Sequence, residues 1–181
     1  MAIDPLTALL DEARAFDAGA ARGRERSLRR QAEEDAALSG VLLDLAEQGA
    51  TVTVRTVAGV AHHGAVVAVG ADFCVLRPPQ GADLFVAAAA ISTVRPHPGE
   101  RHRPATGDRQ PPSDVHLLDV LGAVVGDLAR VSIGTRHGEV VTGELRAVGS
   151  DVVTVALEAD RRDLCYLSAS SMCDVVVLRS G

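Results

Sequence analysis

Two hydrophobic periods follow one another along the chain. From Asp4 to about Ala46, apolar residues recur every three or four positions, which is the spacing of an amphipathic helix. Asp4 is a suitable N-cap because Pro5 then occupies the first helical position. From Ala50 the period becomes two, which predicts short strands separated by tight turns. The chain is therefore predicted to begin with helix and to continue mainly as β-structure.

The first alternating region predicts five short strands. Val52 and Val54 mark the first strand, residues 66–69 and 73–76 mark the next two, and two short strands end the region near Pro96. The following stretch is rich in proline and arginine and is predicted to be a flexible linker that buries nothing.

The alternating pattern then begins again. A shift of 79 residues aligns the first region with the second. The glycines, the turn aspartate and the alternating apolar residues then fall on similar residues. The matched pairs are Ala50–Ala129, Val52–Val131, Val54–Ile133, Thr56–Thr135, Gly59–Gly138, Gly64–Gly143, Val69–Val148, Gly70–Gly149 and Asp72–Asp151. A two-residue slip in the loop aligns Val86, Ala88, Ile91 and Val94 with Leu167, Ala169, Met172 and Val175. The preceding helix recurs too, since Val41, Leu42 and Leu45 match Val120, Leu121 and Val124.

The repeated glycines predict how each repeat bends. Gly59 and Gly138 suit turns that need a positive φ, whereas Gly64 and Gly143 suit sharp bends where a small sheet curls on itself. We predict a mainly β protein with two tandem five-stranded, bent antiparallel barrels, each preceded by a short helix. The predicted parts are an N-terminal amphipathic helix (1–37), a first barrel (38–96), a linker (97–113) and a second barrel (114–181).

Three motifs carry a resemblance to a known family. They are "GVAHHG" at 59–64, "VGADFCVL" at 69–76 and "AISTVRP" at 90–96. With them the first repeat resembles the Sm-like (LSm) superfamily, and most closely the Hfq family of bacterial RNA chaperones, whose last strand typically reads Lys-His-Ala-Ile-Ser-Thr before an apolar pair and proline. The resemblance implies RNA as a partner. Other small bent barrels, SH3-like ones among them, share much of the glycine pattern.

The residues that form the family's uridine pocket are replaced here. Ala88 and Ala89 stand where the resemblance implies Lys-His, and the second repeat has Ser168–Met172 there. Alanine neither hydrogen-bonds a base edge nor neutralises phosphate, so the usual pocket is not expected.

The resemblance also implies that edge strands pair, because Sm-like proteins join the fourth strand of one subunit to the fifth of the next. The fourth strands would be "LFVA" and "LCYLS", and the fifth "AISTV" and "MCDVVVL". Unpaired edges invite a partner strand. We therefore expect the two repeats to pair with each other or with other chains through these edges.

Composition limits the function classes. The formal net charge of −6 argues against a protein whose whole surface attracts phosphate backbones. Cys74, Cys165 and Cys173 lack metal-site spacing and are expected to be reduced and buried, with a Cys165–Cys173 disulfide as the alternative. No cationic leader and no apolar run long enough to cross a bilayer are recognisable, so we expect a cytoplasmic protein without a membrane partner.

Candidate sites are few. His62–His63 and Arg136–His137 are assigned to equivalent turns between the first and second strands, either as solvated residues or as ligand contacts. The residues proposed to contact nucleic acid or a protein partner are Arg26, Arg29, Arg30, His62, His63, Arg77, Arg136, His137, Arg161 and Arg162. The charged N-terminal block is interpreted first as a solvated helix face, with phosphate contact by its arginines as the alternative.

Catalysis, cofactors and metals are not expected. His97, Glu100 and His102 have spacings that a metal could use, but they lie in the linker without a rigid support. Ser168, Ser170, Ser171 and Cys173 show no nucleophile-and-base arrangement, and no small-molecule substrate is evident.

Two functional hypotheses remain. The first is a noncatalytic, RNA-associated Sm-like regulatory module that contacts RNA through arginines outside the usual pocket. The second is a protein–protein interaction or assembly scaffold that binds no nucleic acid.

Overall fold

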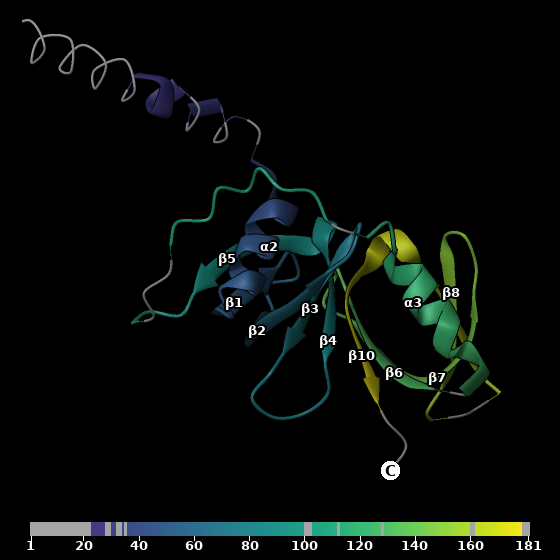
Figure 1. Cartoon of the computed structure of the whole chain (residues 1–181). Helices are drawn as coiled ribbons and strands as arrows, with labels where there is room; N and C mark the ends of the chain where they lie inside the picture. Colours follow the sequence, from purple (N-terminus) through teal and green to yellow (C-terminus); the bar gives the residue numbers. More distant parts are fainter. Residues whose placement is uncertain are drawn as a thin grey trace, which may run out of the picture.

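The computed structural model describes residues 23–27, 30, 31, 34, 36–99, 103–111, 113–127, 129–159 and 162–178. It is a mainly β protein with one ten-stranded antiparallel sheet and a few helices (Figure 1). The strand order is β5-β1-β2-β3-β4-β10-β6-β7-β8-β9. The two halves of this order correspond to the two sequence repeats, and each half has five strands.

Most elements begin and end close to the predicted places, but β2 begins at Ala61, earlier than the predicted strand at 66–69. The first half contains α2 (Leu38–Glu47), β1 (Thr51–Thr56), β2 (Ala61–Val69), β3 (Phe73–Arg77), β4 (Leu84–Ala87), η1 (Ala88–Ala90) and β5 (Ile91–Pro96). The second half contains α3 (Leu117–Val124), η2 (Val125–Asp127), β6 (Arg130–Thr135), β7 (Val140–Val148), β8 (Val152–Leu157), β9 (Leu164–Ser168), η3 (Ala169–Ser171) and β10 (Met172–Leu178).

The two halves repeat one another residue by residue. Val52 pairs with Pro96 in the first half, and its counterpart Val131 pairs with Val177 in the second. The pairing register shifts between Val66 and Ala68 in β2, and again between the counterparts Leu145 and Ala147 in β7. The alignment made from the sequence, slip included, therefore holds in the pairing register.

The turn glycines behave as predicted, and the strand glycines allow two strands to approach closely. Gly59 and Gly138 both have φ of 83°, in the left-handed region that glycine adopts without strain. A Cβ on Gly64 would lie 2.6 Å from the carbonyl oxygen of Arg77, and one on Gly143 would lie 2.0 Å from that of Ala156. Because a side chain would collide with the neighbouring strand, glycine permits the close approach of two backbones.

Each half has its own helix (Figure 1), and the buried residues form two clusters. Leu42 of α2 and its counterpart Leu121 of α3 are both fully buried, which confirms the predicted match of the two helices. Residues 36 and 37 are not helical, and Ala37 has an extended backbone before α2 begins. This break falls at the predicted boundary between the N-terminal helix (1–37) and the first repeat. Most of the predicted 1–37 helix lies outside the described residues.

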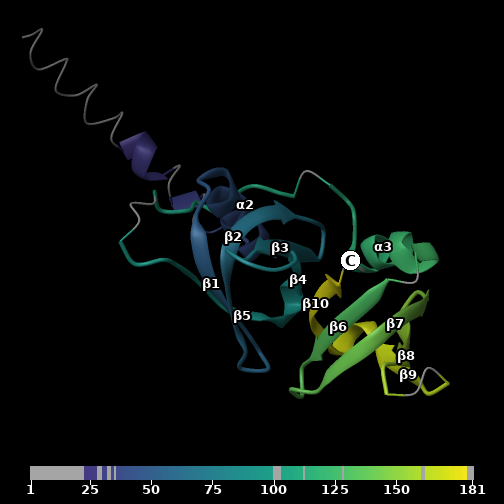
Figure 2. The same ribbon diagram turned by 90° about the horizontal axis from the view of Figure 1, so that it is seen from below.

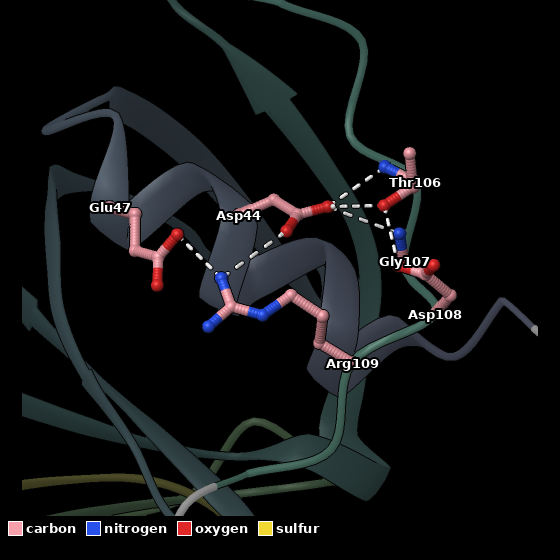
Figure 3. A network of polar contacts seen from close by, with 6 residues as sticks. All are labelled: Asp44, Glu47, Thr106, Gly107, Asp108 and Arg109. Carbon is pink, nitrogen blue, oxygen red and sulfur yellow. Dashed lines mark hydrogen bonds and ion pairs between the residues drawn. The ribbon is translucent and has the colours of Figure 1, made fainter.

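The segment between the repeats is attached to α2 (Figure 3). One carboxylate oxygen of Asp44 accepts hydrogen bonds from the backbone N–H groups of Thr106 at 2.8 Å and Gly107 at 3.1 Å. Arg109 lies 2.5 Å from the carboxylate of Glu47. Gly107 is buried and packs closely against α2. A Cβ on Gly40 would lie only 2.2 Å from the carbonyl oxygen of Gly107. The prediction that this segment buries nothing is therefore wrong. Its proline content indicated a flexible linker, but its backbone N–H groups donate hydrogen bonds to an acidic side chain of α2.

The Asp44 contacts make part of the stability dependent on pH. Burial alone would raise the pKa of the Asp44 carboxyl, but the hydrogen bonds from Gly107 and Thr106 and the charge of Arg109 outweigh it and lower the pKa. Because the pKa is lower in the folded state, this stability is present above the unfolded pKa, about 4, and is lost as the pH falls through the folded pKa.

Asp44→Asn is expected to lower the free energy of unfolding by about 1 kcal/mol near neutral pH. The difference from the wild type should shrink as the pH falls below about 4, where Asp44 itself becomes protonated. Urea unfolding followed by circular dichroism measures both effects. Asp108→Asn is the matched control, because Asp108 accepts a hydrogen bond from the Thr106 hydroxyl within its own segment. An equal loss of unfolding free energy in both variants would contradict the stabilising role assigned to Asp44.

Candidate functional site: the seam between the halves and the two sheet edges

The two halves are joined by direct strand pairing, here called the seam. β4 of the first half pairs with β10 of the second in antiparallel register, Leu84 with Val176, Phe85 with Val175 and Val86 with Asp174 (Figure 2). The expectation was that edge strands pair either between the two repeats or with other chains, and β4 and β10 pair between the repeats. The halves consequently form one continuous sheet.

The seam is also a hydrophobic interface. The first-half residues Phe73 and Val75 belong to the buried core of the second half, together with Leu117 and Leu121 of α3. Phe85 packs against the same cluster, and its ring centroid lies 5.9 Å from that of Phe73. All four residues of 73–76 are buried because β3 has a core on each face.

Polar contacts fix the position of α3 across the seam. Asp72, at the turn before β3, accepts a hydrogen bond from the backbone N–H of Leu117 at 2.8 Å, the first residue of α3. Its other carboxylate oxygen lies 3.2 Å from Nδ1 of His116. A carboxylate at a helix N-terminus satisfies an unpaired donor and interacts favourably with the helix dipole.

Two predicted contact residues, His62 and Arg136, lie at the seam. Nε2 of His62 is 3.3 Å from the Asp174 carboxylate in the other half, and both side chains are largely buried. Arg136 donates to the carbonyl oxygens of Ser170 at 2.8 Å and Ala89 at 3.0 Å. Both side chains therefore contact the other half of the chain.

The other predicted contact residues do not form one site with them. Arg77 forms a bidentate ion pair with Asp83, and His63 contacts the Thr53 hydroxyl at 2.8 Å. His137, Arg26, Arg30 and Arg162 are exposed. Arg29 and Arg161 lie outside the described residues.

One turn assignment is wrong. Arg136 and His137 lie in the turn between β6 and β7, as predicted, but His62 and His63 lie within β2, paired with Val54 and Thr53. Their counterparts are Val141 and Thr142, so the two pairs are not equivalent. The strand extends further than the apolar alternation because backbone pairing with β1 continues through polar positions.

The alanines of the first repeat line a small cavity at the seam. It has a volume of about 190 Å3 and is lined by Asp72, Ala87, Ala89, Leu117, Leu118, Arg136, Ala169, Ser170 and Met172. The guanidinium of Arg136 already donates to two backbone carbonyls there. The lining offers little for recognising the polar edge of a base.

Burial raises the pKa of the Cys74 and Cys173 thiols, and the serines around η3 hydrogen-bond among themselves. All three cysteines are free, and burial raises the pKa of the Cys74 thiol to about 12. The hydroxyl of Ser168 lies 2.9 Å from that of Ser170, and Ser171 donates to the carbonyl oxygen of Ser168. Within the described ranges, no group of three or more His, Cys, Asp or Glu side chains could hold a metal ion. His97 is described, whereas Glu100 and His102 are not.

Sequence reasoning missed the roles of two acidic residues at the seam. Asp72 was assigned only to a turn, although its recurrence as Asp151 could have indicated a function shared by both repeats. Asp174 falls on Thr93 in the aligned repeats, so repetition gave no signal for it. A Cβ on Gly134 would lie 2.7 Å from the Asp174 carboxylate, so glycine leaves space for that group.

The remaining fourth and fifth strands lie at the two edges of the sheet. β5 pairs with β1 and β9 pairs with β8, and each ends the strand order. On β9, Leu164 and Tyr166 are 47% and 68% exposed. An exposed strand edge with large apolar or aromatic side chains is a surface for pairing with another strand.

No family model matches the chain, and no curated protein or solved structure matches it significantly. In the part of the chain that the structure describes, none of the helices is both long and apolar enough to cross a membrane.

Proposed function

We propose that this chain is a noncatalytic assembly module, built from two Sm-like barrels, that binds protein strands at the β5 and β9 edges. The observation that carries the proposal is the seam itself. It joins a fourth strand to a fifth strand, and one strand of each kind is left at the edges of the sheet.

The distribution of charge favours a protein partner over RNA. Among the described arginines, Arg77, Arg109 and Arg130 are paired with carboxylates, and Arg136 is bonded to backbone carbonyls. The net charge of −6 opposes attraction to a phosphate backbone. Arg30 is exposed, and it keeps RNA association as the second candidate function.

The proposal is tested by purifying the tagged full chain from its own cells and measuring mass and nucleic-acid content. We expect complexes larger than one chain that contain protein without RNA. With one Tyr and no Trp, the chain absorbs so little ultraviolet light that bound RNA would dominate the spectrum. The double variant Thr93→Lys with Tyr166→Lys should lose the complexes, because charged side chains block pairing at an edge.

Val140→Lys is the matched control, since Val140 is 63% exposed on β7, an interior strand. Complexes that persist in the edge variant, or a single chain in both samples, would refute assembly through the edges. RNA that dissociates steeply with salt, about one log unit per log unit of salt for each phosphate neutralised, would favour the second candidate.

A further inference from the structure

The first half has a basic surface on the face of β5, β1 and β2 that is turned away from its core. Val54 belongs to that core, so its neighbours Thr53 and Arg55 in β1 point to the opposite face of the sheet. Thr53 pairs directly with His63 of β2 and with Arg95 of β5. Side chains that lie directly opposite one another in a ladder share a face. Arg55, His63 and Arg95 therefore form one surface, here called the basic face.

The side chains of the basic face are accessible to a ligand. Arg55, His63 and Arg95 are all exposed. The Arg55 guanidinium donates to the backbone carbonyl of Gly59 at 3.1 Å, and His63 contacts the Thr53 hydroxyl at 2.8 Å. Within the described part of the chain, neither Arg55 nor Arg95 forms an ion pair with a carboxylate. Their charge is therefore available to an anionic group from another molecule.

The second repeat shows that the fold does not require this charge. At the three equivalent positions of the second half, all the residues are uncharged. They are Gly134, Thr142 and Val176, in place of Arg55, His63 and Arg95. The strands pair in the same register in both halves. The basic face is therefore a feature of the first half alone, and the shared ladder does not explain it.

We propose that the basic face binds an acidic segment of a partner protein, with carboxylates two residues apart in an extended chain. Arg55 and Arg95 are diagonal neighbours on adjacent strands, so their Cβ atoms lie roughly 7 Å apart. Carboxylates at alternate positions of an extended chain are also about 7 Å apart. Each guanidinium can bind one carboxylate through two parallel hydrogen bonds. One pair of acidic residues therefore matches both arginines at once.

The composition of the face favours carboxylates over RNA. No residue of β5, β1 or β2 is Phe, Tyr or Trp, so the face has none of these rings on which bases could stack. Two arginines and one histidine neutralise about three charges at most, whereas strong electrostatic binding to nucleic acid uses about 6–10 phosphate contacts. A short acidic segment needs no more than the face provides.

The basic face is separate from the edges at which strand pairing is proposed. Arg55 lies on β1 and His63 on β2, which are interior strands of the sheet. Binding to this face requires no pairing with the free side of β5. The inference therefore goes beyond the proposed function, and either one can fail without the other.

The test is a titration of a fluorescein-labelled peptide of alternating Glu and Thr, six residues long, with the full chain at low salt. Fluorescence anisotropy should show binding, and the same peptide with Gln in place of Glu should not bind. Arg55→Gln with Arg95→Gln is expected to weaken binding at least tenfold. Arg130→Gln with Arg146→Gln is the matched control, because it removes two charges from arginines that are paired with Glu158 and Glu144. The control should change binding less than threefold.

Arg55→Lys with Arg95→Lys separates charge from geometry. Lysine keeps the charge but lacks the planar fork, so binding should weaken about threefold, less than in the Gln pair. Circular dichroism should be unchanged in every variant, since the replaced side chains are exposed.

A wild-type chain that does not bind the acidic peptide, or an equal loss in the control pair, would overturn the inference. Tighter binding of a six-nucleotide single-stranded RNA, lost in the Gln pair, would assign the face to phosphate backbones and overturn it too. In either case, complexes that depend on the β5 and β9 edges would leave the proposed function standing.

Discussion

Replacing Gly143 with alanine is expected to lower the free energy of unfolding by about 3 kcal/mol, near the upper end for overpacking. The new Cβ would lie 2.0 Å from the carbonyl oxygen of Ala156 and 2.8 Å from Cγ1 of Val155. Backbone atoms of a paired strand cannot move aside without breaking the ladder between β7 and β8. Chemical denaturation followed by circular dichroism measures the loss.

Gly122→Ala is the matched control, because it is the same change in the same half. Gly122 lies within α3, and no atom lies within 4 Å of the added Cβ. Alanine in a helix is more favourable than glycine by up to about 1 kcal/mol, so this variant should be unchanged or more stable. If both variants behaved alike, the close approach of β7 and β8 would be refuted.

Leu42→Ala and Leu121→Ala are each expected to cost about 2–5 kcal/mol, because both leucines are fully buried. In both variants we expect one unfolding transition that moves to lower denaturant. Phe73 and Val75 of the first half belong to the core of the second, and Val176 of the second half packs against the core of the first. Weakening either core therefore destabilises both halves.

The measurement is urea unfolding monitored by circular dichroism and by hydrogen exchange of amides in β2 and β7. Val140→Ala serves as the control, since this side chain is 63% exposed and its loss should cost less than about 0.5 kcal/mol. Two separate transitions, only one of which moves in Leu42→Ala, would mean that the halves fold independently and that the seam contributes little.

The candidate site could be predicted only in part. The positions of the edge strands followed from alternation and from the resemblance, and the pairing of β4 with β10 agrees with that prediction. The choice of contact residues was less successful. His62 and Arg136 were named as polar residues of exposed turns, but their side chains contact groups in or across the seam. Whether a basic side chain is free to bind a ligand depends on which carboxylate or carbonyl group the fold places near it.

By itself, the sequence determined the helix-then-strand order, the two repeats and their register, because periodicity and glycine positions are local constraints on the backbone. It also determined that the alanines at 88 and 89 cannot form a polar base pocket. Only the tertiary structure decided that the halves merge into one sheet, that Asp72 caps α3 and that Asp44 holds residues 106 and 107. Those contacts join residues far apart in sequence, and their energy depends on distances that no local pattern specifies.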